Sequence, residues 1–569
     1  MQHQESTIQD NGTMLNAYPD SMGGTLADIV HILERPEFQD VFRSFYVLPS
    51  IFHTDLDRGF SVIDYGINKE LADKSSLEDL SKLGINLKLD FILNHLSVLS
   101  PQFQDILKNG EKSPCKEFFI PWNLFWKDHG EMTADGYIQP DAELIKDMFF
   151  RKPGLPILMV RMPGGKDVPY WNTFYQEIVY PKLTVQDFMT VGVQYAQAQE
   201  MCKIVNSTLT NGQNPKDIEF GRYSQYKTPV VEVLEARRQY LGQMDLNIKS
   251  PLVWGFYDET LSKLAEYGAD IVRLDAFAYA PKEPGSKNFL NDPDTWELLV
   301  KVRNLADRYH LKLLPEIHAT YAEKTYEHIA QKGYMTYDFF LPGLILDALE
   351  SHQGAYLIQW AEELQEKNIR VVNMLGCHDG IPLLDLKGLL PDERIESLIN
   401  TVVNRGGAVK NLHGQKNMYY QVNATYYSAL GEDDRKMLLA RALQLFMPGK
   451  PQIWYLDLFA GKNDYDAVKN ASSAAHKEIN RTNLSLDEID KRLQLPVVQK
   501  QLEMLRLRNT CPAFGFGSQM EIRSSSPERF KFIWRNDNHS ATLTANLRTY
   551  EHRILTEAGG EIRSILRSE

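Results

Sequence analysis

The feature that most restricts the fold of this chain is a repeated alternation of short apolar segments with amphipathic helical segments. The apolar segments are rich in β-branched residues, as is typical of buried strands. Strand candidates lie at 14–18, 42–49, 85–95, 269–277, 311–318, 334–341, 369–379 and 451–456, and helical segments at 26–33, 77–83, 260–267, 295–309, 324–330, 354–364 and 437–445. Strands that alternate with helices form a parallel sheet. Eight such strands predict an α/β fold, the (β/α)8 TIM barrel.

The interruptions of this alternation predict the domain organisation. Residues 98–244 lack it and are interpreted as an enlarged domain inserted after strand 3, part of which is helical. A second insertion, an irregular loop excursion, is expected near strands 7 and 8 at 387–427. The barrel then comprises 1–97, 245–386 and 428–510. Residues 520–554 alternate with period two, which predicts a small antiparallel β domain at the C-terminus, residues 511–569.

Composition and charge argue against several classes of protein. The 569 residues carry a formal net charge of −13, which disfavours nucleic acid or an anionic membrane as a partner. The N-terminus is polar, and we find no signal peptide or membrane-spanning run. The four cysteines are far apart and have no metal-binding spacing, as is typical of reduced thiols. We therefore expect a cytoplasmic protein that is a monomer or a homodimer.

Four strand candidates end in polar side chains, which are costly in a buried strand unless they are paired or used. These endings are Asp90/Asn94/His95, Arg273/Asp275, Glu316/His318 and His378/Asp379. Arg273 and Asp275 share one face of their strand, so a buried ion pair that only stabilises the fold is an alternative for that strand alone. Active sites of such barrels lie at the C-terminal ends of the strands, and four polar endings predict a site there. No cluster of residues indicates a catalytic metal.

Carboxylates on neighbouring strand ends are the groups that a retaining glycoside reaction requires. One attacks the anomeric carbon and the other protonates the leaving oxygen, with about 5–5.5 Å between them. Glu316 follows a proline among leucines, a dry setting that favours a raised pKa and the role of proton donor. Arg273 should keep Asp275 ionised as the nucleophile. Asp379 and His378 would bind sugar hydroxyls and stabilise an oxocarbenium-like transition state.

These strand ends resemble the four signature regions of the α-amylase superfamily of glycoside hydrolases, and the chain is similar to its sucrose phosphorylase subfamily. The resemblance runs from about residue 16 to 514, apart from one insertion. This extra helical segment, at about 175–241, is absent from shorter relatives. It rests on IVRLDAFAY at 271–279, LPEIH at 314–318, CHDGI at 377–381, NATYYSAL at 423–430, AGKND at 460–464 and INR at 479–481. It implies Asp275 as nucleophile, Glu316 as acid/base and Asp379 as transition-state stabiliser.

The implied reaction transfers glucose from sucrose to inorganic phosphate and gives α-D-glucose 1-phosphate and fructose with retention. A small sugar and phosphate are the implied partners, no cofactor is implied, and no calcium site is expected, which leaves Asn94 a structural role. The implied substrate-binding residues are Asp57, Phe60, His95, Phe174, Arg273, Tyr279, His318, His378, Gln421 and Arg481. Asp57 and Arg481 would pair to close the glucose pocket.

Two loops, 150–156 and 410–421, are expected to bind phosphate and the leaving group. Cations in the first loop, Arg151 and Lys152, suit a dianionic acceptor, although ordinary solvated charge is the alternative. Relatives that act on sucrose often have Leu-Asp before the Tyr-Gln of the second loop, which this chain lacks. Relatives that use sucrose 6′-phosphate pair an arginine of the first loop with a histidine of the second. Tyr420 stands at the apparent histidine position and favours unphosphorylated sucrose.

Several alternatives stay open at this stage. Lys410, His413 and Lys416 keep sucrose 6′-phosphate possible as the donor. Other candidates are a phosphorylase of glucosylglycerol or glucosylglycerate, and a hydrolase or transglucosidase. A catalytically inactive barrel is disfavoured because all three carboxylates are intact. Within the insertion, helices are predicted at 184–205 and 228–241. Their apolar faces must be buried, which suggests a packed extension that acts as a lid or a subunit interface.

Overall fold

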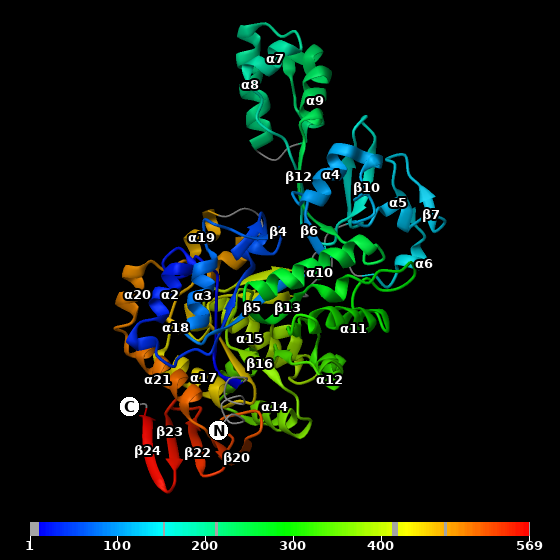
Figure 1. The fold of residues 1–569 in the computed structure, drawn as a ribbon. Coiled ribbons are helices and arrows are strands. Elements are labelled where there is room, and N and C mark those ends of the chain that lie inside the picture. Colours follow the sequence, from blue (N-terminus) through cyan, green and yellow to red (C-terminus); the bar gives the residue numbers. More distant parts are fainter. Residues whose placement is uncertain are drawn as a thin grey trace.

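The computed structural model describes residues 11–148, 150–151, 154–210, 214–411, 419–470 and 475–567. Its centre is a parallel sheet in the order β14–β13–β5–β2–β1–β19–β16–β15. The end strands β14 and β15 lie beside each other, so the sheet closes into a barrel surrounded by helices (Figure 1). The strands are β1 (Met14–Ala17), β2 (Ser44–Val47), β5 (Asn86–Ile92), β13 (Ala269–Asp275), β14 (Lys312–Pro315), β15 (Thr336–Asp338), β16 (Val371–Met374) and β19 (Lys450–Trp454). Each coincides with a strand candidate, and the predicted barrel is confirmed.

The helices between the strands begin at local sequence signals and bury one apolar stripe. In α2 (Leu26–Leu33), Thr25 forms a capping box with Asp28, which satisfies backbone N–H groups at the helix start. The other helices expected from periodicity are α3 (Lys74–Lys82), α10 (Pro251–Glu266), α11 (Asp294–Asp307), α12 (Thr325–Gln331), α14 (Ala355–Glu366) and α17 (Asp434–Phe446). In the described part of the chain, no helix is both long and apolar enough to cross a membrane.

Residues 98–244 leave the barrel between β5 and β13. The part next to the barrel contains α4 (Pro101–Asn109) and the antiparallel pair β9 (Ile157–Arg161) and β10 (Asp167–Trp171). Trp122, Trp126 and Trp171 pack against one another in a small aromatic core that is separate from the barrel core. Burial of these large rings stabilises this part of the insertion.

A helical module, with described residues 180–210 and 214–238, projects away from the rest of the molecule (Figure 1). Its stalk is an antiparallel ribbon of β11 (Gln176–Val179) and β12 (Gln239–Asp245), and β12 also pairs with β6 (His95–Ser97) at the barrel. The helices α7 (Val185–Thr190), α8 (Tyr195–Thr210) and α9 (Lys227–Ala236) enclose a hydrophobic core of their own. The apolar faces are therefore buried within the module. Its role as a lid or a subunit interface stays a prediction.

Two details of the insertion differ from prediction. The helix expected at 184–205 is interrupted between α7 and α8, where Gly192 has φ +85° and ends the first helix. The second expected helix ends at Ala236, and residues 239–241 belong to β12 instead. Strand pairing with β11 outweighs local helical periodicity here.

The stretch 387–427, predicted to be irregular, contains regular elements. Helix α15 (Asp392–Asn404) and the antiparallel pair β17 (Ala408–Asn411) and β18 (Tyr419–Asn423) lie within it. The prediction of irregular structure was wrong for this helix. Its buried residues Ile395, Leu398, Ile399 and Val402 follow helical spacing and carried the signal.

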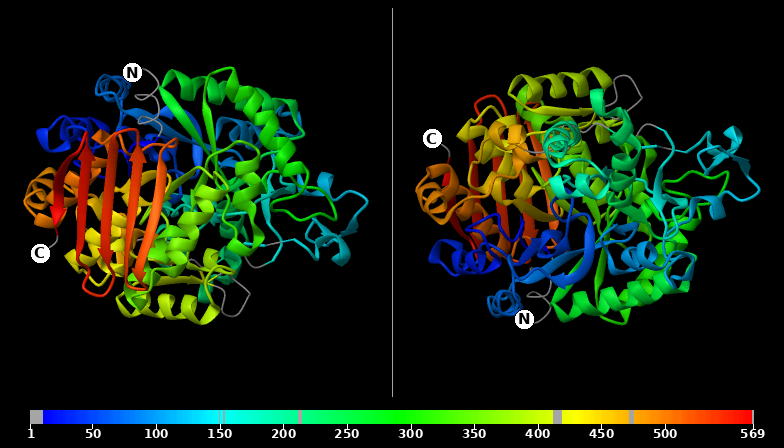
Figure 2. Two further views of the ribbon diagram at one scale, coloured as in Figure 1. Left: turned by 90° about the horizontal axis from the view of Figure 1, so that it is seen from below. Right: turned by 90° about the horizontal axis from the view of Figure 1, so that it is seen from above.

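The C-terminal part is an antiparallel sheet, as predicted. Its strands are β20 (Gln519–Ser526), β21 (Arg529–Asn536), β22 (His539–Asn546), β23 (His552–Ala558) and β24 (Glu561–Arg567). The sheet lies across helices of the barrel wall (Figure 2). Trp534 Nε1 donates a hydrogen bond of 2.8 Å to the carbonyl oxygen of Phe446 at the end of α17. This sheet and the helical module lie at opposite ends of the molecule in Figure 1.

Candidate active site

Arg273 of β13 joins three carboxylates at the C-terminal end of the barrel. It is in register with Asp90 of β5, and its Nη1 lies 2.5 Å from Asp90 Oδ1 and 3.0 Å from Asp275 Oδ1. Its Nη2 lies 2.5 Å from Glu316 Oε1, just after β14. Ala276, directly after Asp275, has φ +52°, a conformation that non-glycine residues adopt at a cost. One guanidinium therefore gathers carboxylates from three neighbouring strands, which is more than a single fold-stabilising ion pair.

Glu316 and His318 follow β14 and face a further carboxylate. His318 Nε2 lies 3.7 Å from Glu316 Oε1, and its Nδ1 lies 3.0 Å from Asp385 Oδ2. Its ring stacks on Phe339 with centroids 3.9 Å apart and planes at 20°. Burial disfavours the charged ring, but the hydrogen bond to Asp385 and the nearby Glu316 carboxylate outweigh it and raise the pKa of His318 to about 10. The ring is therefore an imidazolium at neutral pH.

Burial and nearby charges shift the pKa values of the two central carboxyl groups in opposite directions. Burial opposes ionisation of Glu316, but Arg273 and His318 outweigh it and lower the pKa of Glu316. Burial raises the pKa of Asp275 well above its usual range; Arg273 offsets this in part, and the Glu316 carboxylate adds to it. The lowered pKa of Glu316 is opposite in direction to the sequence prediction of a raised one, and the ionised Asp275 stays a prediction. The sequence places Arg273 two residues from Asp275 but does not show that its other nitrogen reaches Glu316.

The loop after β16 supplies His378 and Asp379 on another wall. Lys477 Nζ lies 2.6 Å from Asp379 Oδ1, and Arg481 Nη2 lies 3.9 Å from the same oxygen. Burial opposes ionisation of Asp379, but Lys477, His378 and Arg481 hold its pKa well below the usual range. Lys477 and Arg481 each also lie 3.7 Å from Asp57, so the structure brings together the predicted Asp57–Arg481 pair.

Aromatic rings form the remaining side of the site. Phe60 stacks on His378 with centroids 4.9 Å apart, and its carbonyl oxygen lies 3.0 Å from His95 Nε2. The loop that carries Asp57 and Phe60 turns at Gly59, where φ is +118° and a Cβ would lie 2.3 Å from the backbone nitrogen of Ser50. Only glycine fits there.

Phe174 links the aromatic side of the site to Arg151 of the first predicted acceptor loop. The Phe174 ring lies 4.9 Å from the ring of His95 and 5.1 Å from that of Tyr279. Arg151 Nη1 donates a hydrogen bond of 2.9 Å to the hydroxyl oxygen of Tyr279, and its guanidinium lies 5.0 Å from the Phe174 ring. Phe174 and Tyr279 are thus brought together as predicted, with Arg151 against both.

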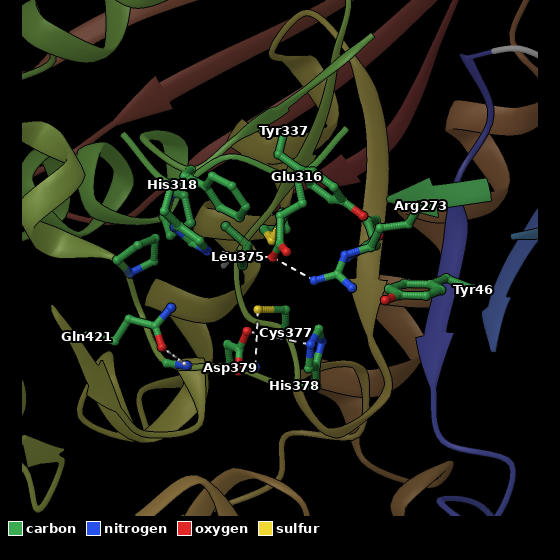
Figure 3. A pocket seen from close by; sticks show the side chains of 16 residues that line it. Tyr46, Arg273, Glu316, His318, Tyr337, Leu375, Cys377, His378, Asp379 and Gln421 are labelled. Atoms are coloured by element: carbon green, nitrogen blue, oxygen red, sulfur yellow. Dashed lines mark hydrogen bonds and ion pairs between the residues drawn. The ribbon is translucent and has the colours of Figure 1, made fainter. Parts of the chain in front are cut away.

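A cavity at this end of the barrel brings many of these side chains together (Figure 3). Arg273 and Glu316 point toward each other on one side, and His378, Asp379 and Gln421 lie on the other. Gln421 Oε1 accepts a hydrogen bond of 3.3 Å from the N–H of Gly380. The lining residues are Tyr46, Arg273, Glu316, His318, Tyr337, Phe339, Pro342, Met374, Leu375, Cys377, His378, Asp379, Gly380, Pro382, Gln421 and Gln452.

The predicted acceptor residues are described only in part. Lys152, and residues 412–418 of the second loop, lie outside the described residues, as does the side chain of Tyr420. Among the described residues, no group of three or more His, Cys, Asp or Glu side chains is arranged to hold a metal ion. Asn94 Oδ1 accepts a hydrogen bond of 3.0 Å from Lys282 Nζ, which also lies 2.8 Å from Asp245. Asn94 therefore belongs to a buried polar cluster, and its structural role stays a prediction.

Four charged residues close to the site were missed from the sequence. Lys88 Nζ lies 2.8 Å from Gln452 Oε1 inside the barrel. A lysine within a largely apolar strand candidate could have indicated this buried charge from the sequence. Lys282 was hidden in a loop, and Asp385 and Lys477 lie in short 3-10 turns that have no periodic pattern. Their importance depends on contacts across the fold, which no local pattern reveals.

Comparisons with known proteins agree with this geometry. No family model matches the chain. It is 49% identical over 559 residues to the sucrose 6(F)-phosphate phosphorylase of Ilumatobacter coccineus, covering 97% of this chain and 96% of the relative. It is 30% identical to the sucrose phosphorylase of Streptococcus mutans, and the match covers 96% of this chain and 97% of that relative. The crystal structure of sucrose 6F-phosphate phosphorylase from Thermoanaerobacter thermosaccharolyticum matches with a TM-score of 0.79 and 30% identity, covering 98% and 97%.

A closed (β/α)8 barrel with three carboxylates at its strand ends is the architecture of the α-amylase superfamily. The chain belongs to the sucrose phosphorylase subfamily of that superfamily. It is therefore an enzyme of the glucoside phosphorylase class.

Proposed function

We propose that the enzyme cleaves a glucosyl fructoside with phosphate by double displacement, with retention, through a β-glucosyl-enzyme. The observation that carries the proposal is the convergence of Asp275 and Glu316 on the two terminal nitrogens of Arg273, at 3.0 and 2.5 Å. Carboxylates on one guanidinium lie only a few ångströms apart, which is compatible with the separation of about 5–5.5 Å in retaining enzymes. Asp379 lines the same cavity as Glu316.

In the first step Asp275 attacks the anomeric carbon while Glu316 gives its proton to the glycosidic oxygen and the fructose part leaves. In the second step Glu316 takes up a proton from hydrogen phosphate. The phosphate oxygen attacks the anomeric carbon and displaces Asp275, which gives α-D-glucose 1-phosphate. Asp379, kept ionised by Lys477, stabilises the oxocarbenium-like transition states between these species.

Proton donation requires a protonated Glu316 when the donor is bound. In the structure, Arg273 and His318 outweigh burial and lower the pKa of Glu316, whereas burial raises the pKa of Asp275. We infer that donor binding exchanges the partner of Glu316, so that the glycosidic oxygen replaces the guanidinium. Arg273 would then keep only two carboxylate partners, Asp275 and Asp90, and would stabilise the ionised form of Asp275. Glu316 directly follows β14, and the proposed exchange is a rotation of its side chain.

The glucosyl unit is proposed to bind between the charged wall and the aromatic side. Asp57 and Arg481, 3.7 Å apart, would bind its hydroxyls at the end far from the reacting carbon. Phe174 and Tyr279 would face the sugar ring, as aromatic rings do in sugar sites. His95 and His378, whose pKa values are lowered mainly by burial, are neutral and can donate or accept hydrogen bonds.

Sucrose 6′-phosphate is the donor that we propose. Support comes from the Ilumatobacter coccineus relative, named sucrose 6(F)-phosphate phosphorylase, at 49% identity. Arg151 supplies a cation on the aromatic side that is suited to a phosphorylated leaving group. Tyr420 at the apparent histidine position favours unphosphorylated sucrose, and the Streptococcus mutans relative carries that name. Sucrose is therefore the second candidate.

The test compares the two donors at saturating phosphate, with α-D-glucose 1-phosphate as the measured product. A kcat/KM at least about ten-fold higher for sucrose 6′-phosphate supports the first candidate. The reverse preference supports sucrose. Free glucose as the main product would overturn phosphorolysis. Turnover of glucosylglycerol or glucosylglycerate alone would exclude both donors.

A further inference from the structure

One buried carboxylate beside the site has no role in the reaction described above. Asp385 lies in the 3-10 turn Leu383–Leu386 after β16 and is only 6% exposed. Its Oδ2 lies 3.0 Å from His318 Nδ1. A carboxylate on one ring nitrogen fixes the orientation of a histidine and directs its other nitrogen away.

The other contacts of His318 hold its ring in one place. Phe339 stacks on one face, with centroids 3.9 Å apart. Nε2 is directed toward Glu316 Oε1 at 3.7 Å, and the ring lines the cavity that contains Asp379 and Gln421 (Figure 3). His318 is therefore next to the residue that takes up the proton of the incoming acceptor.

A phosphate dianion in this cavity is close to carboxylates. Glu316 and Asp379 line the cavity, and like charges repel a dianion strongly at low dielectric. Water meets no such barrier. Arg273 lies against Glu316 in this cavity, but Asp90 and Asp275 share its guanidinium. His318, 3.7 Å from Glu316, supplies a second cation there, and this cation would favour phosphate over water.

We propose that Asp385 is a positioning residue that holds His318 as a cation, and that this cation favours phosphate over water as the acceptor. The inference rests on the proposed phosphorolysis. The charged groups that face His318 are Asp385 and Glu316, and they outweigh burial in raising its pKa to about 10. Glu323, on the turn Tyr321–Glu323, faces Asp385 and helps to raise the pKa of that carboxyl, although burial is the larger cause.

The test uses Asp385→Asn, which keeps the size and a hydrogen-bond acceptor but removes the charge. α-D-Glucosyl fluoride serves as the donor, because its leaving group needs no proton. The measured quantity is the ratio of glucose 1-phosphate to glucose from pH 6 to 9, relative to wild type. We expect this relative ratio to fall about ten-fold above pH 7, as His318 returns toward its ordinary pKa of about 6.5. Asp385→Glu should restore it.

A structural role alone predicts a different result. Equal loss of phosphorolysis and hydrolysis at every pH, or an unchanged ratio at pH 8.5, would overturn the proposal. His318→Gln is the matched control and should lower the ratio equally at every pH. If wild type forms no glucose 1-phosphate from any donor, the proposed function itself fails. An NMR titration of His318 then decides the positioning role, which is overturned if Asp385→Asn leaves the pKa of His318 unchanged.

Discussion

Replacing Glu316 with glutamine separates proton transfer from the rest of the reaction. Glutamine keeps the size of the side chain and an oxygen that accepts a hydrogen bond from Arg273, so the fold should be preserved. It has no proton to give to the glycosidic oxygen. It also removes one of the charges that raise the pKa of Asp275, so the nucleophile ionises more readily. The variant therefore retains a nucleophile and loses the acid.

The size of the effect should depend on the leaving group. Loss of a general acid costs about 10²–10⁴-fold in rate, equivalent to about 3–5 kcal/mol of transition-state stabilisation. We expect this full loss with sucrose 6′-phosphate or sucrose, whose leaving oxygen needs a proton. With α-D-glucosyl fluoride the loss of the first step should be less than about ten-fold, because fluoride leaves without one.

The assay compares kcat/KM for the two kinds of donor in wild type and Glu316→Gln, with circular dichroism to check the fold. Glu362→Gln is a matched control, because Glu362 is an exposed carboxylate of α14. It should behave as wild type with both donors. An equal loss with every donor in Glu316→Gln would refute the role of Glu316 as the acid.

Two further predictions concern the active site, and a third concerns the helical module. Asp275→Asn should abolish turnover of every donor, and activity of more than a few per cent in a steady-state assay would remove it as the nucleophile. Lys477→Met should raise the pKa of Asp379, which must be ionised for turnover. As the solution is acidified, kcat/KM should therefore begin to fall at a higher pH than in wild type. An unchanged acidic side of the pH profile of kcat/KM would contradict this. Phe188→Ala should destabilise the helical module by about 3–5 kcal/mol, because Phe188 is fully buried in its separate core. Hydrogen exchange should then accelerate in 180–238 and stay unchanged in the barrel strands, and uniform acceleration would show that the module is not independent.

The helical module shows where local sequence patterns stop being sufficient. Periodicity identified most of its helical residues, and the apolar faces correctly required burial. The local pattern did not show whether these apolar faces would pack on the barrel or on one another. The pairing of β11 with β12 decides it, because that ribbon carries the helices away from the body and leaves them to form their own core (Figure 1).

The sequence by itself determined the barrel and the groups at its strand ends. Alternating apolar strands and amphipathic helices fold in few ways, and the C-terminal ends of parallel strands must meet at one face. Only the tertiary structure decided which charges touch. Arg273 of β13 contacts Glu316 at the end of the neighbouring strand β14. Asp385 contacts His318, and Lys477 contacts Asp379, although the members of each pair are far apart in the sequence. Ionisation depends on contacts of a few ångströms, and residues far apart in sequence make those contacts only after folding.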